Sequence, residues 1–149
     1  MKLTDIWFTA LAESEDGQMI VVSGRDNISD FRKSGKFRER AEVTWSYRSA
    51  INGMPSEEEA KKMEEVQLVL QRSMEKNKLA ILTGVYTGAG ERTWVFYTRN
   101  VPAFGLMLND ALADFERLPL SIYTEKDLGW AEYQEMYESK PEEGSDDFE

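Results

Sequence analysis

Short stretches of apolar residues recur along the chain with the length and spacing of β-strands. Val43, Trp45 and Tyr47 alternate with polar residues, which is the pattern of a strand with one buried face. Five other stretches are expected to be strands, at residues 6–12, 19–23, 79–87, 92–99 and 120–124. Asp16-Gly17 separates the first two of them and predicts a hairpin turn.

Two longer segments have the apolar spacing of helices that bury one side. The first covers about residues 56–76 and begins with Ser56-x-x-Glu59. In such a capping box the serine hydroxyl and the glutamate side chain each satisfy a free backbone N–H. Asn100 is expected to cap the second helix. A short amphipathic segment follows Asp127-Leu-Gly-Trp130 near the C-terminus.

From Val43 onward the predicted order is strand, helix, strand, strand, helix, strand. This order indicates an α+β fold with a ferredoxin-like, split βαβ core. The N-terminal β-hairpin would extend or flank its antiparallel sheet. Residues 25–40 are expected to form a loop with one helical turn. We expect a single domain over residues 1–140 and a disordered, acidic tail over residues 141–149, because the tail has little to pack.

Composition narrows the classes of function. The 149 residues include neither cysteine nor histidine, so disulfides, zinc sites built on thiolate or imidazole, and Ser–His–Asp or Cys–His catalysis are excluded. Two carboxylates alone can still hydrolyse a glycoside. No apolar run approaches the length of a membrane-spanning helix and no secretory signal is recognised, so we expect a cytoplasmic protein. We expect neither a cofactor nor a bound metal.

Charge is unevenly distributed around a net value of −10. Residues 132–149 carry eight acidic residues and one lysine, whereas residues 32–40 carry five basic residues and one glutamate. An acidic protein repels nucleic acid at long range, so nucleic acid is not the expected partner. The basic segment is instead a candidate surface for an acidic partner; its members are Arg32, Lys33, Lys36, Arg38 and Arg40.

Aromatic residues form a second candidate interaction surface. Trp94 and Tyr97 lie on one predicted strand, and Trp130 and Tyr133 lie in the short C-terminal segment. Buried aromatic rings usually belong to a core, and this is the interpretation that the pattern favours. The functional alternative is an exposed sheet face that binds a ligand or a partner.

Several motifs, taken in order, resemble a known family. They are Trp45-x-Tyr47, Asn52-Gly53-Met54-Pro55, Arg92-x-Trp94-x-Phe96-Tyr97 and Asp127-x-x-Trp130-x-x-Tyr133. Their order and spacing resemble the bacterial family known as domain of unknown function 695, over about residues 6–137. That family usually has proline after the aspartate, where this chain has Leu128. The resemblance implies no activity. Domains of this family sometimes occur beside a domain similar to the protein regulator of ribonuclease E. This association alone implies a regulatory or adaptor role.

The sequence therefore favours a non-enzymatic binding or regulatory module that acts through protein–protein contacts. Two alternatives remain open: a carboxylate-based hydrolase of a small or sugar-like substrate, and an acidic regulator of RNA metabolism. The sequence does not predict the oligomeric state.

Overall fold

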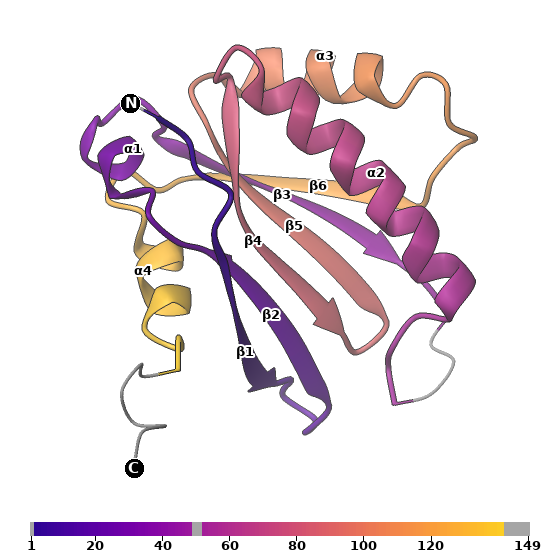
Figure 1. Ribbon diagram of the computed structural model, residues 1–149. Helices are drawn as coiled ribbons and strands as arrows, with labels where there is room; N and C mark the ends of the chain where they lie inside the picture. Colours follow the sequence, from indigo (N-terminus) through magenta and orange to yellow (C-terminus); the bar gives the residue numbers. More distant parts are fainter. Residues whose placement is uncertain (1, 49–51, 142–149) are drawn as a thin grey trace.

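A computed structural model describes residues 2–48 and 52–141 of the chain. They form one open sheet with helices on both of its faces (Figure 1). In chain order the elements are β1 (Trp7–Glu13), β2 (Met19–Arg25), α1 (Ser29–Lys33), β3 (Glu39–Ser46), α2 (Glu57–Glu75), β4 (Ala80–Gly88), β5 (Glu91–Thr98), α3 (Val101–Ala111), β6 (Leu120–Lys126) and α4 (Ala131–Tyr137). The expected tail lies, beyond Pro141, outside the described residues.

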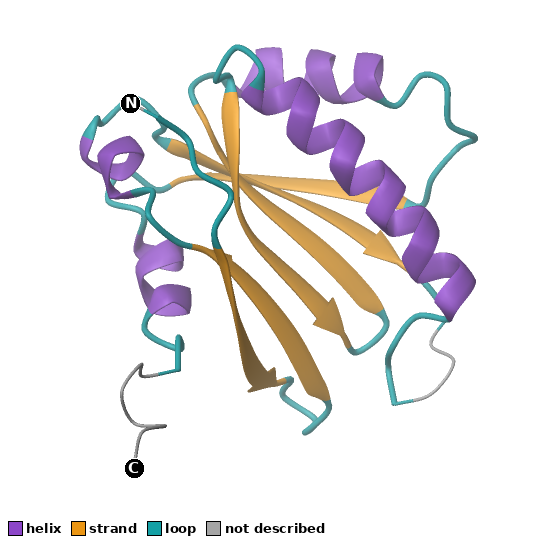
Figure 2. Ribbon diagram, viewed as in Figure 1, coloured by secondary structure: helices purple, strands orange, loops and turns teal. Residues whose placement is uncertain are grey.

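The six strands pair in the order β1-β2-β4-β5-β3-β6, and every pairing is antiparallel. The predicted α+β class and the extension of the sheet by the N-terminal hairpin are therefore confirmed. β1 and β6 are the two edge strands, and all six strands fan out from one end of the sheet (Figure 2).

Two hydrophobic cores sandwich the sheet, because alternate residues of each strand point to opposite faces. On one face α2 and α3 pack together and cover a core that contains Trp45, Trp94 and Phe96. On the other face α1 and α4 cover a smaller core that contains Tyr97 and Trp130. Figure 1 shows the two helix pairs on opposite sides of the strands.

The predicted helix starts are confirmed at both long helices. The Ser56 hydroxyl accepts a hydrogen bond from the Glu59 backbone N–H at 3.1 Å, and the Asn100 side chain accepts from the Ala103 N–H at 2.8 Å. The capping box also predicts a hydrogen bond from the Ser56 backbone N–H to the Glu59 carboxylate. The described residues do not form this second bond. Gly88-Ala89-Gly90 connects β4 to β5, as the glycines predict.

The segment at 25–40 is a loop with one short helix, as the sequence predicts. It contains the short helix α1, and its apolar anchors Ile28, Phe31 and Phe37 are all buried. β3 begins at Glu39, four residues before the first apolar residue of the alternating stretch. The strand starts this early because Glu39 and Arg40 pair with both β5 and β6, so their backbone groups are used on both sides.

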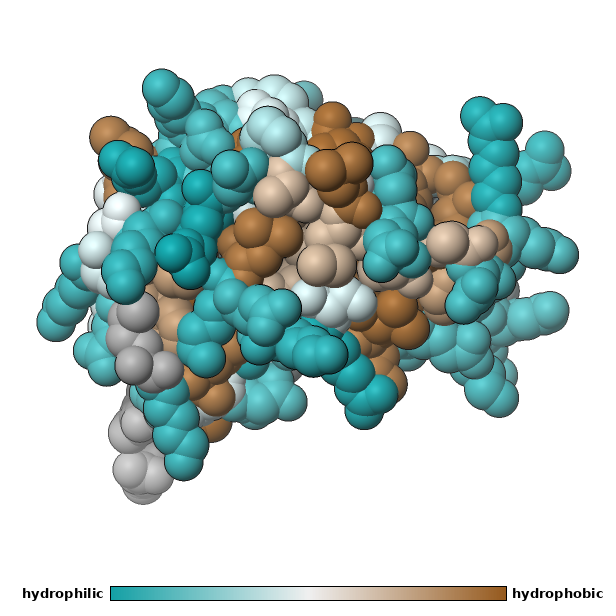
Figure 3. Space-filling view, turned by 90° about the horizontal axis from the view of Figure 1, so that it is seen from above, coloured by the Kyte–Doolittle hydropathy of each residue, from teal (hydrophilic) through white to brown (hydrophobic). Residues whose placement is uncertain are grey.

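The surface is dominated by charged side chains with scattered apolar residues. In the view from above, hydrophilic side chains project outward at many points, and hydrophobic residues are scattered between them (Figure 3). The large apolar side chains that are exposed include Leu68 on α2 and Leu106 on α3. Single exposed apolar residues are common on proteins, so they do not by themselves mark a site.

Candidate functional site

A groove lies on the α2 side of the sheet, where α2 packs on β4, and residues of β2, β4, β5 and α2 line it. We call it the α2 groove; its volume is about 390 Å³. Its lining residues are Trp7, Val21, Ser23, Met54, Pro55, Glu64, Gln67, Val85, Thr87 and Arg92.

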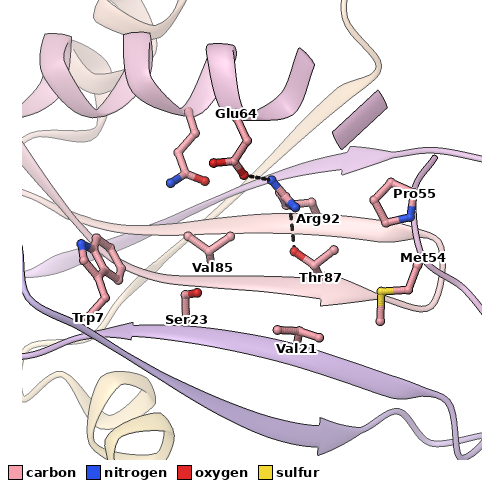
Figure 4. Close-up of a pocket in the computed structure, with 10 residues that line it drawn as sticks. Trp7, Val21, Ser23, Met54, Pro55, Glu64, Val85, Thr87 and Arg92 are labelled. Atoms are coloured by element: carbon pink, nitrogen blue, oxygen red, sulfur yellow. Dashed lines mark hydrogen bonds and ion pairs between the residues drawn. The ribbon is translucent and has the colours of Figure 1, made fainter. Parts of the chain in front are cut away.

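The floor of the α2 groove is built from two paired strands. Ser23 lies opposite Val85, and Val21 lies opposite Thr87, in the ladder between β2 and β4. Directly opposed residues of an antiparallel ladder share one face of the sheet. The floor therefore alternates apolar and hydroxyl side chains, with Trp7 at one end and Met54 at the other (Figure 4).

Arg92 is the cation of the groove. Its Nη1 donates to Glu64 Oε2 at 2.7 Å, and its Nε donates to Thr87 Oγ1 at 2.9 Å (Figure 4). The Arg92 side chain is 11% exposed, whereas that of Glu64 is 63% exposed. Within the described residues Nη2 of Arg92 has no partner, so it can donate to an acceptor that enters the groove.

Gln67 supplies a second donor beside Arg92. The indole Nε1 of Trp94 donates to Gln67 Oε1 at 2.9 Å, which fixes the orientation of the amide. The Gln67 Nε2 group then remains a donor without a partner in the described part of the chain. Because Trp94 is fully buried, the core holds this groove side chain in place.

The Trp7 end of the groove is held by an ion pair beneath the ring. The buried Arg25 guanidinium lies 5.1 Å from the centre of the Trp7 ring and donates to Glu75 Oε2 at 2.6 Å. The Trp7 Nε1 group donates to Asp5 at 2.6 Å. A cation–π contact and a hydrogen bond together fix the indole plane, which gives the groove a rigid aromatic end wall.

A second hollow lies on the opposite face, beside α4. We call it the α4 pocket; its volume is about 490 Å³. It is lined by Ala12, Val22, Arg40, Tyr86, Ala131, Glu132, Glu135, Met136 and Ser139.

Asp127 organises the chain beside the α4 pocket. Its carboxylate accepts hydrogen bonds from the Tyr97 hydroxyl at 2.7 Å, from Arg40 Nη1 at 2.9 Å and from the backbone N–H groups of Ala131 and Glu132. Burial opposes the charge, but these donors outweigh it and hold the pKa of Asp127 below its usual value. The aspartate therefore joins β3, β5 and the start of α4.

The aromatic residues of the Asp127-x-x-Trp130-x-x-Tyr133 motif pack under this network. Trp130 stacks on Tyr97 with ring centres 4.4 Å apart, and its Nε1 donates to the Phe37 carbonyl at 2.7 Å. The Tyr133 hydroxyl donates to the Arg25 carbonyl. Burial raises the pKa of the Tyr97 and Tyr133 hydroxyls, so both remain neutral donors at physiological pH.

Glu132 is the ionisable group of the α4 pocket whose charge is disfavoured. Burial raises its pKa, although the Tyr86 hydroxyl donates to its Oε2 at 2.6 Å and Arg40 lies nearby. Burial and the Glu132 charge together raise the pKa of Tyr86. The pair therefore consists of a neutral phenol and a carboxylate that binds a proton more readily than in water.

The hydrogen bonds of the Asp127 and Glu132 carboxylates favour a structural role over a catalytic one. The Asp127 carboxylate accepts four hydrogen bonds from Tyr97, Arg40 and two backbone N–H groups, and its side chain is only 8% exposed. A nucleophile or base needs a free oxygen that faces the substrate. Glu132 has a raised pKa, but the α4 pocket does not offer a second carboxylate that is both free and buried. In the part of the chain that the structure describes, no group of three acidic side chains is placed to hold a metal ion.

The four candidate aromatic residues are all buried, so they do not form an exposed surface. Trp94 is 0% exposed and lies under α2, while Tyr97, Trp130 and Tyr133 lie together under α4. The interpretation of these rings as core residues fits the structure. The exposed-face alternative fails for them, because helices cover both faces of β5 at these positions.

The basic segment divides into two groups. Arg40 binds Asp127 and Glu42, and Arg32 donates to the Gly129 carbonyl and to Gln134. Lys33, Lys36 and Arg38 are exposed, and none of the three forms an ion pair with a described residue. Only this second group is therefore available to a partner.

Sequence reasoning missed Arg92, Glu64 and Gln67 as site residues. The sequence did contain a signal for Arg92. Alternate residues of a strand point to the same face, so Arg92 lies on the face that carries the core residues Trp94 and Phe96. An arginine on the core face of a strand must have a partner or border a cavity. Glu64 and Gln67 give no comparable signal, because polar residues are common along a helix that has one face in water.

The fold defines an α+β protein with an open, six-stranded antiparallel sheet and helices on both faces. The chain belongs to the family described as "Family of unknown function (DUF695)", which it matches over residues 6–137. No curated protein and no solved structure matches the chain. Among the described residues, no helix is long and apolar enough to cross a lipid bilayer.

Proposed function

We propose that this chain is a binding module that holds an extended segment of a partner protein in the α2 groove. A carboxylate of that segment binds Arg92, and an apolar side chain packs on the groove floor beside Trp7. The observation that carries the proposal is Arg92 itself: a nearly buried guanidinium with an unused Nη2, at the side of an open, partly apolar groove.

The shape of the groove favours a short extended segment. It follows β2 and β4 along one side of α2, from Trp7 to Pro55 (Figure 4). Its volume of about 390 Å³ falls in the range of sites that hold a ligand of a few residues. Side chains of an extended peptide alternate, which matches a floor where Val21 and Val85 alternate with Ser23 and Thr87.

The donors of the groove favour a carboxylate. Arg92 and Gln67 each have an unused N–H group, and both lie on the same side of the floor. The Arg92 partner in the free protein is Glu64, whose side chain is mostly in water and is therefore easily displaced. A carboxylate that meets the guanidinium with two oxygens forms a stronger and more directional contact than a single N–H bond.

The same geometry favours binding over carboxylate-based hydrolysis. A glycosidase needs two carboxyl groups that face each other across a substrate. Glu64 is the sole acidic residue that lines the α2 groove. On the other face, Asp127 is occupied by protein donors.

The strand order also supports a finer description of the fold. β3, α2, β4, β5, α3 and β6 follow one another in the chain, and their strands lie in the order β4-β5-β3-β6. We propose that these six elements are a ferredoxin-like, split βαβ core. In this description the N-terminal hairpin is an addition beside β4, and the α2 groove lies where the addition meets the core.

Selection from a random peptide library on the immobilised full chain tests the proposal. One library has free C-termini and the other has amidated C-termini, so a terminal carboxylate is distinguished from Asp or Glu side chains. We expect enrichment of peptides that place a carboxylate next to an apolar residue. Arg92→Gln should abolish the enrichment, and Arg99→Gln, at an exposed arginine outside the groove, should retain it.

Two outcomes contradict the proposed function. One is selection of peptides without a carboxylate in both libraries. The other is equal enrichment by the wild-type chain and Arg92→Gln, with both chains folded by thermal melting.

A further inference from the structure

β6 is the most exposed strand of the sheet. Every residue from Ser121 to Lys126 is exposed, whereas each of the other strands has at least one buried residue. Ile122 and Tyr123 point to opposite faces and are 47% and 53% exposed. An apolar residue exposed on each face of an edge strand is the feature that soluble proteins usually avoid.

The outer edge of β6 also has free backbone groups. At its two ends, the Asp127 N–H donates to the Arg38 carbonyl, and the Ser46 N–H donates to the Pro119 carbonyl. Hydrogen-bonded pairs alternate along an antiparallel ladder, so the odd-numbered residues of β6 bond to β3. The N–H and C=O groups of Ile122, Thr124 and Lys126 therefore point away from the sheet, and no described residue pairs with them.

We infer that β6 pairs antiparallel with β6 of a second copy of this chain, about a two-fold axis at Thr124. Rotation by 180° about an axis at Thr124 brings the three outward residues of the second strand against those of the first. Thr124 then faces Thr124 of the second copy, and Ile122 faces Lys126 of the second copy. Tyr123 then lies opposite Glu125. No like charges oppose each other in this register, and the two sheets join into one with their helices on the same sides.

Charge at the two ends of β6 favours a second copy over an unrelated strand. Arg38 and Lys126 lie at the end of β6 and form no ion pair with a described residue. The exposed segment that leads into β6 carries Asp114 and Glu116 against Arg117. Antiparallel pairing places the basic end of each copy beside the acidic start of the other.

The opposite edge, β1, is less exposed than β6. β1 also has outward backbone groups, at its odd-numbered residues, because the Asp26 N–H donates to the Ile6 carbonyl. Leu11 of β1 is 67% exposed, but other β1 side chains are covered: Ala10 is buried, and Trp7 and Phe8 are half-buried. The opposite edge therefore gives a matched control for a proline substitution in β6.

Sedimentation velocity over increasing protein concentration tests the pairing. The wild-type mass should rise from 17.2 kDa toward twice that value. Thr124→Pro removes an outward N–H that the sheet does not use, so it should stay monomeric and folded. Thr9→Pro makes the same change on β1 and should dimerise as the wild type does. A wild-type chain that remains monomeric to about 1 mM overturns the inference.

Charge reversal tests the antiparallel arrangement. Arg38→Glu and Glu116→Arg should each weaken the dimer at low salt, and the double variant should recover it, because it restores opposite charges at the two ends of β6. If Thr9→Pro is monomeric and Thr124→Pro still dimerises, the assignment of the interface to β6 is overturned. A double variant that dimerises no better than the single variants overturns the proposed orientation.

Discussion

At the scale of single residues, Asp127 is the acceptor on which the α4 side of the molecule depends. Four donors from three elements meet on its two oxygens, among them Tyr97 and Arg40. The family motif that contains Asp127, Trp130 and Tyr133 is thereby explained as a packing unit: the aspartate fixes the turn, and the two rings fill the space under it.

Asp127→Asn should destabilise the fold by about 3 kcal/mol, because an amide group would face buried donors that now share a carboxylate. The folded-state pKa of Asp127 is lowered, so its contribution is present above the unfolded pKa of about 4 and is lost as pH falls through the folded pKa. Urea titration should therefore show a difference between the two proteins at pH 7 that shrinks at acidic pH. Asp114→Asn, at an exposed position, should change stability by less than about 0.5 kcal/mol.

Glu132 should have the opposite pH dependence. Its folded-state pKa is raised, so the stabilisation that it contributes is present below the unfolded pKa and is lost as pH rises through the folded pKa. Glu132→Gln should therefore gain stability relative to the wild type as pH rises from the unfolded pKa of Glu132 through its folded pKa. Tyr86→Phe removes the hydrogen bond that favours the charged form, so its loss of stability over the same range should be steeper than that of the wild type. Identical pH profiles for all three proteins would contradict this assignment.

Single-residue roles were the hardest part to foresee from the sequence. The buried aromatic residues and the apolar anchors Ile28, Phe31 and Phe37 follow from their hydrophobicity alone. Arg40 was grouped with four other cations because charge patterns ignore which side of a strand a residue occupies. Its real environment depends on Asp127, which is 87 residues away in the sequence.

At the scale of elements, the local rules for helix starts and turns were sufficient. Ser56, Asn100 and the glycines after β4 have the predicted roles because each acts through a neighbour a few residues away. The early start of β3 could not be predicted, since it depends on pairing with β5 and β6 on both sides.

Ser56→Ala should lower the free energy of unfolding by about 1 kcal/mol, because the Glu59 N–H loses its acceptor at the start of α2. Ser56→Asp keeps an acceptor at the same position and should retain most of the stability. Denaturant titration of the three proteins measures the effect. Equal loss in Ala and Asp variants would show that the cap is not the cause.

At the scale of the whole molecule, the important feature is uneven coverage of one sheet. α2 and α3 cover the strands of the larger core and leave the floor formed by β2 and β4 open at the side of α2. That opening is the α2 groove. Its location could not be predicted from the sequence, because it depends on where the N-terminal hairpin joins the sheet.

The same uneven coverage leaves both edges of the sheet open. The groove and the β6 edge lie at opposite ends of the strand order. A pair of molecules joined at β6 would thus carry two separate grooves, so Thr124→Pro should change the stoichiometry of an assembly without changing peptide binding at one groove.

Tryptophan side-chain NMR gives the most direct test of groove binding. The chain has four tryptophans: Trp7 lines the groove, Trp94 donates to the groove residue Gln67, Trp45 packs edge-on against Trp94, and Trp130 lies in the core on the other face of the sheet. On titration with the most enriched library peptide, we expect the indole N–H signals of Trp7 and Trp94 to move and that of Trp130, on the opposite face of the sheet, to stay. The shifts should disappear in Arg92→Gln and persist in Arg99→Gln. Movement of the Trp130 signal with Trp7 and Trp94 unchanged would place the peptide beside α4 and contradict binding in the α2 groove.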